Sequence, residues 1–346
     1  MICDLCKSRI FYPASVIFAS QSENNRQKKK STLLPQAKVL VCVDSMYRKR
    51  IMNNQYEIAK RRALAEIVAP EYAANPKVAG VLLAGSVARG LADGFSDIEI
   101  DIYWHTPPTD KDLSAPIERA GWPIVYRHVD ENEWADGFLI EGVKVDTSQF
   151  LVSTIDRWLD DALVHADTEP EYQVRITAIQ HGQPLYGAEL IERWRARTAE
   201  YPAGLAHAMM AQYLDFRSRE LMEMLAARDD VLLLHQDLVA VEQQILSVLM
   251  GVNRVYAPHP YHKWLDWEIG QLKIAPPDLN RRLRQVLRAE PRAAVDQLYQ
   301  LVEETIELVE LHLPDFDTSA ARAVFVKGRV VEEDNANGAE PARRSI

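Results

Sequence analysis

The sequence predicts an α+β protein in which a mixed sheet with flanking helices is followed by an all-α helical bundle. The apolar run Val78–Leu83 indicates a buried strand, and the strict alternation over Ser96–Tyr103 indicates a half-buried one. Residues 136–150 are typical of a strand, a turn at Glu141-Gly142 and a second strand. From Thr154 onward apolar residues recur at helical spacing, which indicates a run of amphipathic helices.

The composition excludes several classes of protein. The chain has 346 residues, of which 47% are hydrophobic and 26% charged, so it is neither wholly disordered nor collagen-like. No apolar run approaches the roughly 18 residues that a membrane helix needs, and we expect a cytoplasmic protein with no membrane partner. The net charge of −10 argues against a nucleic-acid partner, because binding to a phosphate backbone depends on clustered Lys and Arg.

The first fifty residues differ from the rest of the chain. They hold ten Lys or Arg and three acids, a charge of +7, which leaves −17 for the remainder. All three cysteines lie here, and Cys3 and Cys6 have the spacing of half a zinc knuckle, but no second pair completes four ligands. We therefore interpret residues 1–51 as a flexible basic N-terminal extension, or as an artefact of start-site assignment, with the fold beginning near Met52.

The rest of the chain divides where the pattern changes from strands to helices. We expect a first folded domain over residues 52–200, a helical bundle domain over 201–316 and a largely disordered tail over 317–346. Helical spacing in the second half predicts helices over Pro170–His181, Ala188–Thr198, Gly204–Asp229, Val231–Gly251, Tyr261–Leu272, Pro277–Ala289 and Ala293–Leu313.

The alternating strand places acids on one face. Its aliphatic residues point into the core, whereas Asp97, Glu99 and Asp101 share the opposite face, where like charges repel. One explanation is a solvated edge strand. The other is metal binding, since carboxylates at i and i+2 lie about 6–7 Å apart and Mg²⁺ prefers oxygen ligands. The preceding Gly85-Ser86 favours the second, because its N–H and hydroxyl groups can approach a phosphate closely.

These features occur together in the string GSVARGLADGFSDIEIDIY, in which ten residues separate Gly85-Ser86 from Asp97-Ile98-Glu99-Ile100. The string resembles the signature of the polymerase-beta-like nucleotidyltransferases, and is most similar to the small bacterial aminoglycoside and lincosamide nucleotidyltransferases with a C-terminal helical domain. The resemblance implies a catalytic domain of the nucleotidyltransferase fold, with the active site in a cleft beside the helical domain. It also implies that Asp97 and Glu99 hold metal and that the nucleotide is bound by Gly85, Ser86, Arg89 and Ser96.

The family has a third carboxylate, on a later strand beside the first. Asp146 is the candidate, because it lies on the polar side of the alternation over residues 143–148, although the family prefers an aliphatic residue where Thr147 follows it. Glu141 is the rival, but its place in the turn is typical of a solvated acid. Asp101 lies outside the family motif, and we favour a position facing solvent or a basic partner for it.

The resemblance implies transfer of a nucleoside monophosphate, with AMP from ATP as the expected case, to a hydroxyl of a small-molecule acceptor with release of pyrophosphate. ATP or another NTP is then the co-substrate. Two Mg²⁺ ions held by Asp97, Glu99 and Asp146 would clamp the attacking and leaving oxygens of an in-line displacement. Lys263 would reach the triphosphate as a point charge, an interpretation that we weigh equally with a surface lysine beside a core tryptophan.

The acidic body of the chain suits a small hydroxylated, cationic acceptor of the kind that antibiotic-resistance enzymes modify. Two alternatives remain: a protein-directed nucleotidyltransferase of the antitoxin type, and a non-catalytic nucleotide-binding regulatory protein. The presence of Asp97, Glu99 and a third acid argues against the second alternative. The sequence fits a monomer or a homodimer.

Overall fold

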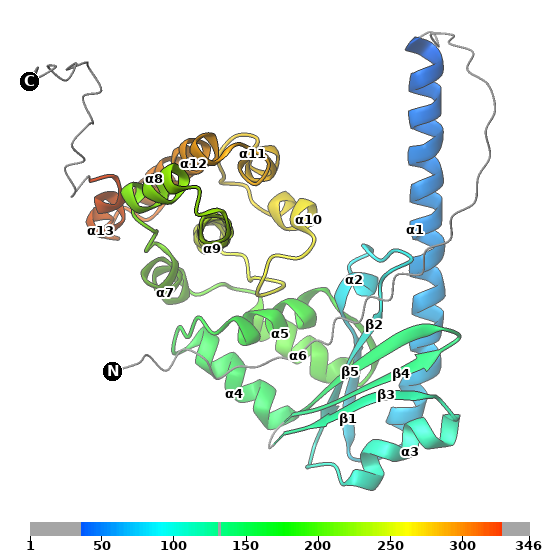
Figure 1. Cartoon of the computed structure of the whole chain (residues 1–346). Helices are drawn as coiled ribbons and strands as arrows, with labels where there is room; N and C mark the ends of the chain where they lie inside the picture. Colours follow the sequence, from blue (N-terminus) through cyan, green and yellow to red (C-terminus); the bar gives the residue numbers. More distant parts are fainter. Residues whose placement is uncertain (1–35, 131–132, 327–346) are drawn as a thin grey trace, which may run out of the picture. The chain divides into compact units, whose positions relative to one another are not determined.

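The computed structural model describes residues 36–130 and 133–326, with side chains from Asn53 onward, and Figure 1 shows its elements. The chain divides into two compact units, Met1–Arg50 and Ile51–Ile346, and the second contains the sheet and the helices that follow it. The side chains of the basic extension, its cysteines among them, and residues 327–346 of the expected tail lie outside the described part.

The described residues form a six-stranded mixed sheet in the order β3-β4-β5-β2-β1-β6, and the α+β class is confirmed. β2 and β5 run parallel to each other, whereas the other neighbouring strands pair antiparallel. The strands span Val78–Leu83 (β1), Ile98–Trp104 (β2), Ile124–Val129 (β3), Glu133–Ile140 (β4), Val143–Leu151 (β5) and Gln183–Tyr186 (β6).

Helices flank the sheet and then make up the C-terminal half of the second unit (Figure 1). None of the helices that the structure describes is both long and apolar enough to cross a membrane. They span Gln36–Ala73 (α1), Gly85–Ala88 (α2), Asp110–Ala120 (α3), Val152–Leu163 (α4), Pro170–His181 (α5), Ala188–Thr198 (α6), Ala203–Tyr213 (α7), Arg219–Arg228 (α8), Val231–Asn253 (α9), Leu265–Gly270 (α10), Leu279–Val286 (α11), Pro291–His312 (α12) and Ser319–Arg322 (α13), and a 3₁₀ turn follows at Ala323–Phe325.

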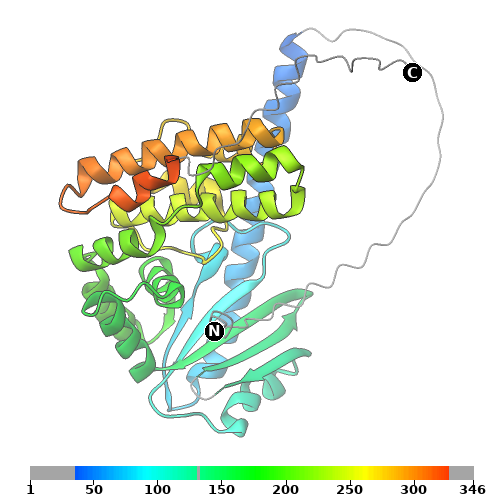
Figure 2. The ribbon, with the colours of Figure 1, turned by 60° about the vertical axis from the view of Figure 1, so that its left-hand side comes forward.

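The two faces of the sheet belong to two hydrophobic cores, and Figures 1 and 2 show the sheet and its flanking helices from two directions. Ile98, Ile100 and Ile102 are fully buried in the core that α1 and α3 cover. Leu82 and Tyr103 belong to the opposite core, with side chains of α4, α5 and α6. The aliphatic and acidic residues of β2 therefore lie on opposite faces of the sheet, as the sequence predicts. The acidic residues lie on the face that α5 packs against.

Two of the predicted helices differ clearly from the structure, whereas the ends of the others lie within about three residues of the prediction. The single helix predicted over 204–229 is interrupted between α7 and α8, because Leu214 and Phe216 turn into the core and Ser218 caps α8 by accepting a hydrogen bond from a backbone N–H. α10 begins at Leu265 rather than at 261, since Trp264 before it has a left-handed φ of 67°, which no helix interior accommodates.

Helical structure also extends past the predicted boundary of the bundle at residue 316. Residues 319–325 form α13 and the 3₁₀ turn, and Ala321 and Val324 are buried in the core. The first ten residues of the expected tail therefore belong to the folded unit.

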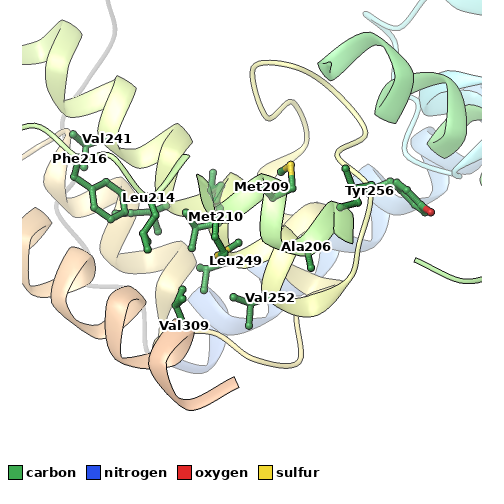
Figure 3. Packing of buried hydrophobic residues seen from close by; sticks show 14 of the residues in the cluster. Ala206, Met209, Met210, Leu214, Phe216, Val241, Leu249, Val252, Tyr256 and Val309 are labelled. Atoms are coloured by element: carbon green, nitrogen blue, oxygen red, sulfur yellow. The ribbon is translucent and has the colours of Figure 1, made fainter. Parts of the chain in front are cut away.

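The core on the α4–α6 face continues into the helical half. Figure 3 shows part of it, where Met209 and Met210 of α7 pack beside Leu249 and Val252 of α9 and Val309 of α12. A hydrogen bond also joins α5 to the segment after α9, because the backbone N–H of Ala257 donates to the side-chain Oε1 of Gln173 at 3.2 Å. This packing gives the loop between α9 and α10 a defined position beside the sheet.

Glu242 on α9 is a buried acid whose Oε1 has no hydrogen-bond partner among the described residues. Burial raises the pKa of its carboxyl to about 8, so folding takes up a proton between about pH 4.5 and 8. Its contribution to stability is therefore greatest at low pH and falls as the pH rises. We expect Glu242→Gln to raise the free energy of unfolding by about 1–3 kcal/mol at pH 8 and to change it little at pH 4.

Urea unfolding of both proteins at the two pH values checks this prediction. Comparing the variant with the wild-type chain at each pH cancels the other titrating groups. An equal difference at pH 4 and pH 8 would contradict it.

Candidate active site

The acidic face of the sheet centres on two neighbouring strands. Glu99 of β2 and Asp146 of β5 are direct partners in the parallel ladder. Asp97 lies immediately before β2, and its charge raises the pKa of both Glu99 and Asp146, where burial is the larger cause in each case. The structure thus brings the three predicted carboxylates to one region of one sheet face.

Gly85 allows Glu99 to lie close to the chain. It lies two residues after the end of β1 and opens α2 with a left-handed φ of 64°. A Cβ on Gly85 would overlap Oε2 of Glu99, so any side chain here would displace the carboxylate. The backbone N–H of Ala84 donates to the carbonyl of Glu99 at 2.9 Å, which fixes the approach of β1 to β2. Ser86 is buried next to this contact.

The Glu99 carboxyl is surrounded by charges of both signs. Burial is the main cause of its raised pKa and Asp97 adds to it, whereas Lys263 and Arg89 lower it. These two cations come from different segments, Arg89 from the end of α2 and Lys263 from the loop before α10. Both were candidates for phosphate binding from the sequence, and both lie within electrostatic reach of the acidic face.

The turn that carries Lys263 is held by contacts of the preceding residue, His262. Nδ1 of His262 lies 3.0 Å from Oε2 of Glu268, and its Nε2 lies 3.5 Å from Oγ of Ser247. His262 and Trp264 both have positive φ, 54° and 67°, a conformation that costs energy for residues other than glycine. Lys263 itself is exposed. The buried His262–Glu268 pair thus fixes a strained turn that carries Lys263, whose charge acts on Glu99.

Arg89 connects this region with α10. Its Cζ lies 5.4 Å from the centroid of the Trp267 ring, a distance typical of a cation–π contact. Its Nε is buried and has no hydrogen-bond partner among the described residues. Burial lowers the pKa of Arg89, and the charges of Glu99 and Glu268 oppose this shift.

Asp146 is held by two residues that the sequence did not single out. Tyr126 of β3 donates a hydrogen bond from its hydroxyl to Oδ1 at 2.9 Å, and Lys144 donates from Nζ to Oδ2 at 2.9 Å. β4 lies between β3 and β5, and its Gly137 is opposite both Tyr126 on β3 and Asp146 on β5. A Cβ on Gly137 would overlap the Tyr126 ring, so the ring reaches Asp146 only because residue 137 has no side chain.

Asp101 has the basic partner that the sequence analysis favoured. It is buried, and Nη1 of Arg175 on α5 donates to its Oδ1 at 3.0 Å while the Tyr103 hydroxyl donates to Oδ2 at 3.3 Å. This pair anchors α5 to the sheet. Glu141 is exposed in the β4–β5 turn with a positive φ of 49°.

Ser96 shapes the loop before β2. Its hydroxyl accepts a hydrogen bond from the backbone N–H of Asp93 at 3.0 Å, and its carbonyl accepts one from Nε of Arg61 at 2.7 Å. In this arrangement Ser96 fixes the loop geometry beside Asp97, and its nucleotide-binding role stays a prediction.

The residues at this face fit Mg²⁺ in their chemistry. Asp97, Glu99 and Asp146 are hard oxygen donors, and burial with mutual repulsion leaves the Glu99 carboxylate poorly neutralised. No three His, Cys, Asp or Glu side chains among the described residues are already gathered as a metal-binding group. Lys144 meanwhile places a cation on Asp146, so a metal at this carboxylate would replace that ammonium group.

The sequence contained partial signals for the residues it missed. Lys144 precedes Asp146 by two positions and therefore shares its strand face. Gly137 interrupts a predicted strand, which often marks a close approach of another group. The contact of Tyr126 with Asp146 cannot be recognised from sequence spacing. The same holds for the contact of His262 with Glu268 across the start of α10.

Comparisons with known proteins add a partial match. A family model described as a domain of unknown function (DUF4037) matches residues 171–265, which extend from α5 to the loop that carries Lys263. No curated protein matches the chain.

Two solved structures are similar to parts of the chain. A nucleotidyltransferase-like protein from Exiguobacterium sibiricum is 13% identical, with a TM-score of 0.33, over 70% of this chain and 75% of that one. A cytoplasmic RNA terminal U-transferase is 12% identical, with a TM-score of 0.23, over 47% of this chain and 49% of that one, about half of its length. We take neither likeness as support for a function.

Proposed function

We propose that the chain is a nucleotidyltransferase that transfers AMP from ATP to a hydroxyl of a small acceptor, with release of pyrophosphate. The observation that carries the proposal is the pairing of Glu99 and Asp146 on adjacent parallel strands, beside Asp97 and against Gly85. Buried carboxylates that repel one another cost stability, and such a cluster is typical of sites that bind a cation during function. The motif from Gly85 to Tyr103 supports the same reaction.

Each residue has a role in this proposal. Asp97, Glu99 and Asp146 would hold Mg²⁺, which when bound neutralises charge on the phosphates and the reacting oxygens. Gly85 and Ser86 would offer a backbone N–H and a hydroxyl to the terminal phosphates. Arg89 and Lys263 would pair with the triphosphate. Asp146, released from Lys144, would accept the proton of the attacking hydroxyl.

Incubation of the full chain with α-labelled NTPs, Mg²⁺ and a panel of aminoglycosides, lincosamides and simpler alcohols tests the proposal. We expect pyrophosphate release and transfer of the label to one acceptor class. Label on protein instead of on a small molecule would favour protein-directed transfer. Metal-dependent NTP binding without pyrophosphate release would favour a regulatory protein and contradict the proposal.

The turn that carries Lys263 gives a prediction for nucleotide binding. We expect His262→Gln to raise KM for ATP about 3- to 30-fold with a smaller change in kcat, because loss of the contact with Glu268 frees a strained turn whose cation binds the nucleotide before and during transfer. Steady-state kinetics with ATP varied checks this. The matched control is His235→Gln on α9, whose exposed ring forms a hydrogen bond with the carbonyl of Val231 one turn earlier in the same helix.

A fall in kcat with an unchanged KM would contradict this prediction. A thermal melt of both variants separates an effect on nucleotide binding from a general loss of folded protein.

A further inference from the structure

A pocket lies close to the candidate active site, because Trp267, whose ring contacts Arg89, is one of its lining residues. It is a cavity of about 190 Å³ between the ends of α5 and α6, the segment that follows α9, and α10. Its lining includes His181, Tyr201, Arg254, Tyr256 and Trp267. None of the side chains that the proposed reaction uses lines it.

The pocket has the shape for one ring. Four of its lining residues are aromatic, and two pairs are in contact: Tyr201 with Tyr256 at 4.6 Å between centroids, and His181 with Trp267 at 5.4 Å. A 150 Å³ cavity in another protein holds benzene, so about 190 Å³ leaves room for a single ring and one small substituent. Rigid aromatic walls of this kind favour a planar ligand.

The charge of the pocket is positive. Arg254 lies at the end of α9 with a left-handed φ of 56°, and its backbone N–H donates to the carbonyl of Gly251, whereas its guanidinium makes no hydrogen bond or ion pair with the described residues. No Asp or Glu is among the lining residues. Burial lowers the pKa of His181, and the charges of Arg89 and Arg195 lower it further, so the ring is neutral near pH 7. An anion is therefore the ligand charge that this surface matches.

A buried polar group near the cavity also lacks a partner. The Tyr201 hydroxyl is buried and forms no hydrogen bond within the described residues, an arrangement that costs free energy unless a ligand or water satisfies it. Tyr201 lies within electrostatic reach of Arg254. A ligand that places an oxygen between them would satisfy both groups.

We propose that this pocket binds a small molecule with one aromatic ring and one anionic substituent, the ring against Trp267 and the anion paired with Arg254. A carboxylate and a phosphate both have the oxygen geometry that a guanidinium recognises in bidentate fashion. The pocket does not depend on nucleotidyl transfer, so binding is measured without NTP. The anionic charge of this ligand is opposite to that of the cationic acceptor that the acidic composition suggested.

Calorimetric titration of the full chain with benzoate, benzamidine and inorganic phosphate tests the proposal. Benzamidine has the same ring with a planar cation, and phosphate supplies an anion without a ring. We expect benzoate to bind at least tenfold more tightly than either of the others. A separate titration with phenyl phosphate distinguishes the two anions, and binding of either anion supports the proposal.

Variants locate the binding. We expect Arg254→Gln to weaken benzoate binding at least tenfold, Arg254→Lys to weaken it less, and Arg292→Gln, a change at an exposed arginine of α12, to leave it unaltered. Because Arg254 is exposed, its variants are expected to fold, and circular dichroism verifies this. Equal binding of benzamidine, or benzoate binding that persists in folded Arg254→Gln, would overturn the proposal.

Discussion

Replacing Glu99 by Gln is expected to lower the rate of nucleotidyl transfer about 10²–10³-fold, the range seen when one electrostatic contact to a transition state is removed. Glu99 lies against Gly85 and beside Asp97. In the proposed reaction its carboxylate would help to hold the Mg²⁺ that binds the phosphates. Gln has nearly the same shape but no charge, so the change removes the metal ligand and keeps the packing. Initial rates of pyrophosphate release at saturating ATP measure the effect.

The same substitution is expected to leave the fold intact or to stabilise it slightly. Burial, and next the charge of Asp97, raise the pKa of Glu99, so its charged form is disfavoured in the folded protein without a cation. A rate loss with an equal or higher melting temperature would therefore identify a functional rather than a structural residue. Glu141→Gln is the control, because Glu141 is an exposed acid in the turn between β4 and β5 of the same sheet.

A second readout does not depend on catalysis. Mg²⁺ with a non-hydrolysable ATP analogue should raise the melting temperature of the wild-type chain and of Glu141→Gln, and raise that of Glu99→Gln much less. If Glu99→Gln transferred nucleotide at the wild-type rate, Glu99 would have no part in the reaction. The assignment of this sheet face would then be wrong.

Much of this face could be predicted because it depends on local pattern. A period of two places Ile98, Ile100 and Ile102 on one side and Glu99 on the other whatever the rest of the fold does, and the structure agrees. The strand–turn–strand pattern around Glu141-Gly142 likewise corresponds to β4 and β5. Local pattern also identified α5 and α6 to the residue.

The remainder depends on contacts between segments far apart in the sequence. Arg175 lies 74 residues from Asp101, and no spacing rule connects them. The break between α7 and α8 is similar, since it reflects burial of Leu214 and Phe216 against helices that come later in the chain. Tertiary packing outweighs helical periodicity at these positions.

The contact between Tyr126 and Asp146 gives the second large expected effect, through a substitution at Gly137, a residue with no side chain of its own in the site. In Gly137→Ala the new methyl group would occupy the space of the Tyr126 ring, so the hydroxyl would lose its contact with Asp146. We expect the transfer rate to fall about 10–100-fold, as when a residue that orients a metal ligand is lost. The control is Gly94→Ala, because a Cβ there meets nothing within 4 Å.

Two further variants separate positioning of Asp146 from simple overpacking. Tyr126→Phe keeps the ring and removes only the hydrogen bond, so it should lower the rate while the free energy of unfolding changes by about 1 kcal/mol. The double variant Gly137→Ala with Tyr126→Ala removes the clash and should recover stability, but it cannot restore the hydrogen bond to Asp146. If the double variant regained activity together with stability, Tyr126 would act only through packing, and Asp146 would be oriented by Lys144 alone among the described residues.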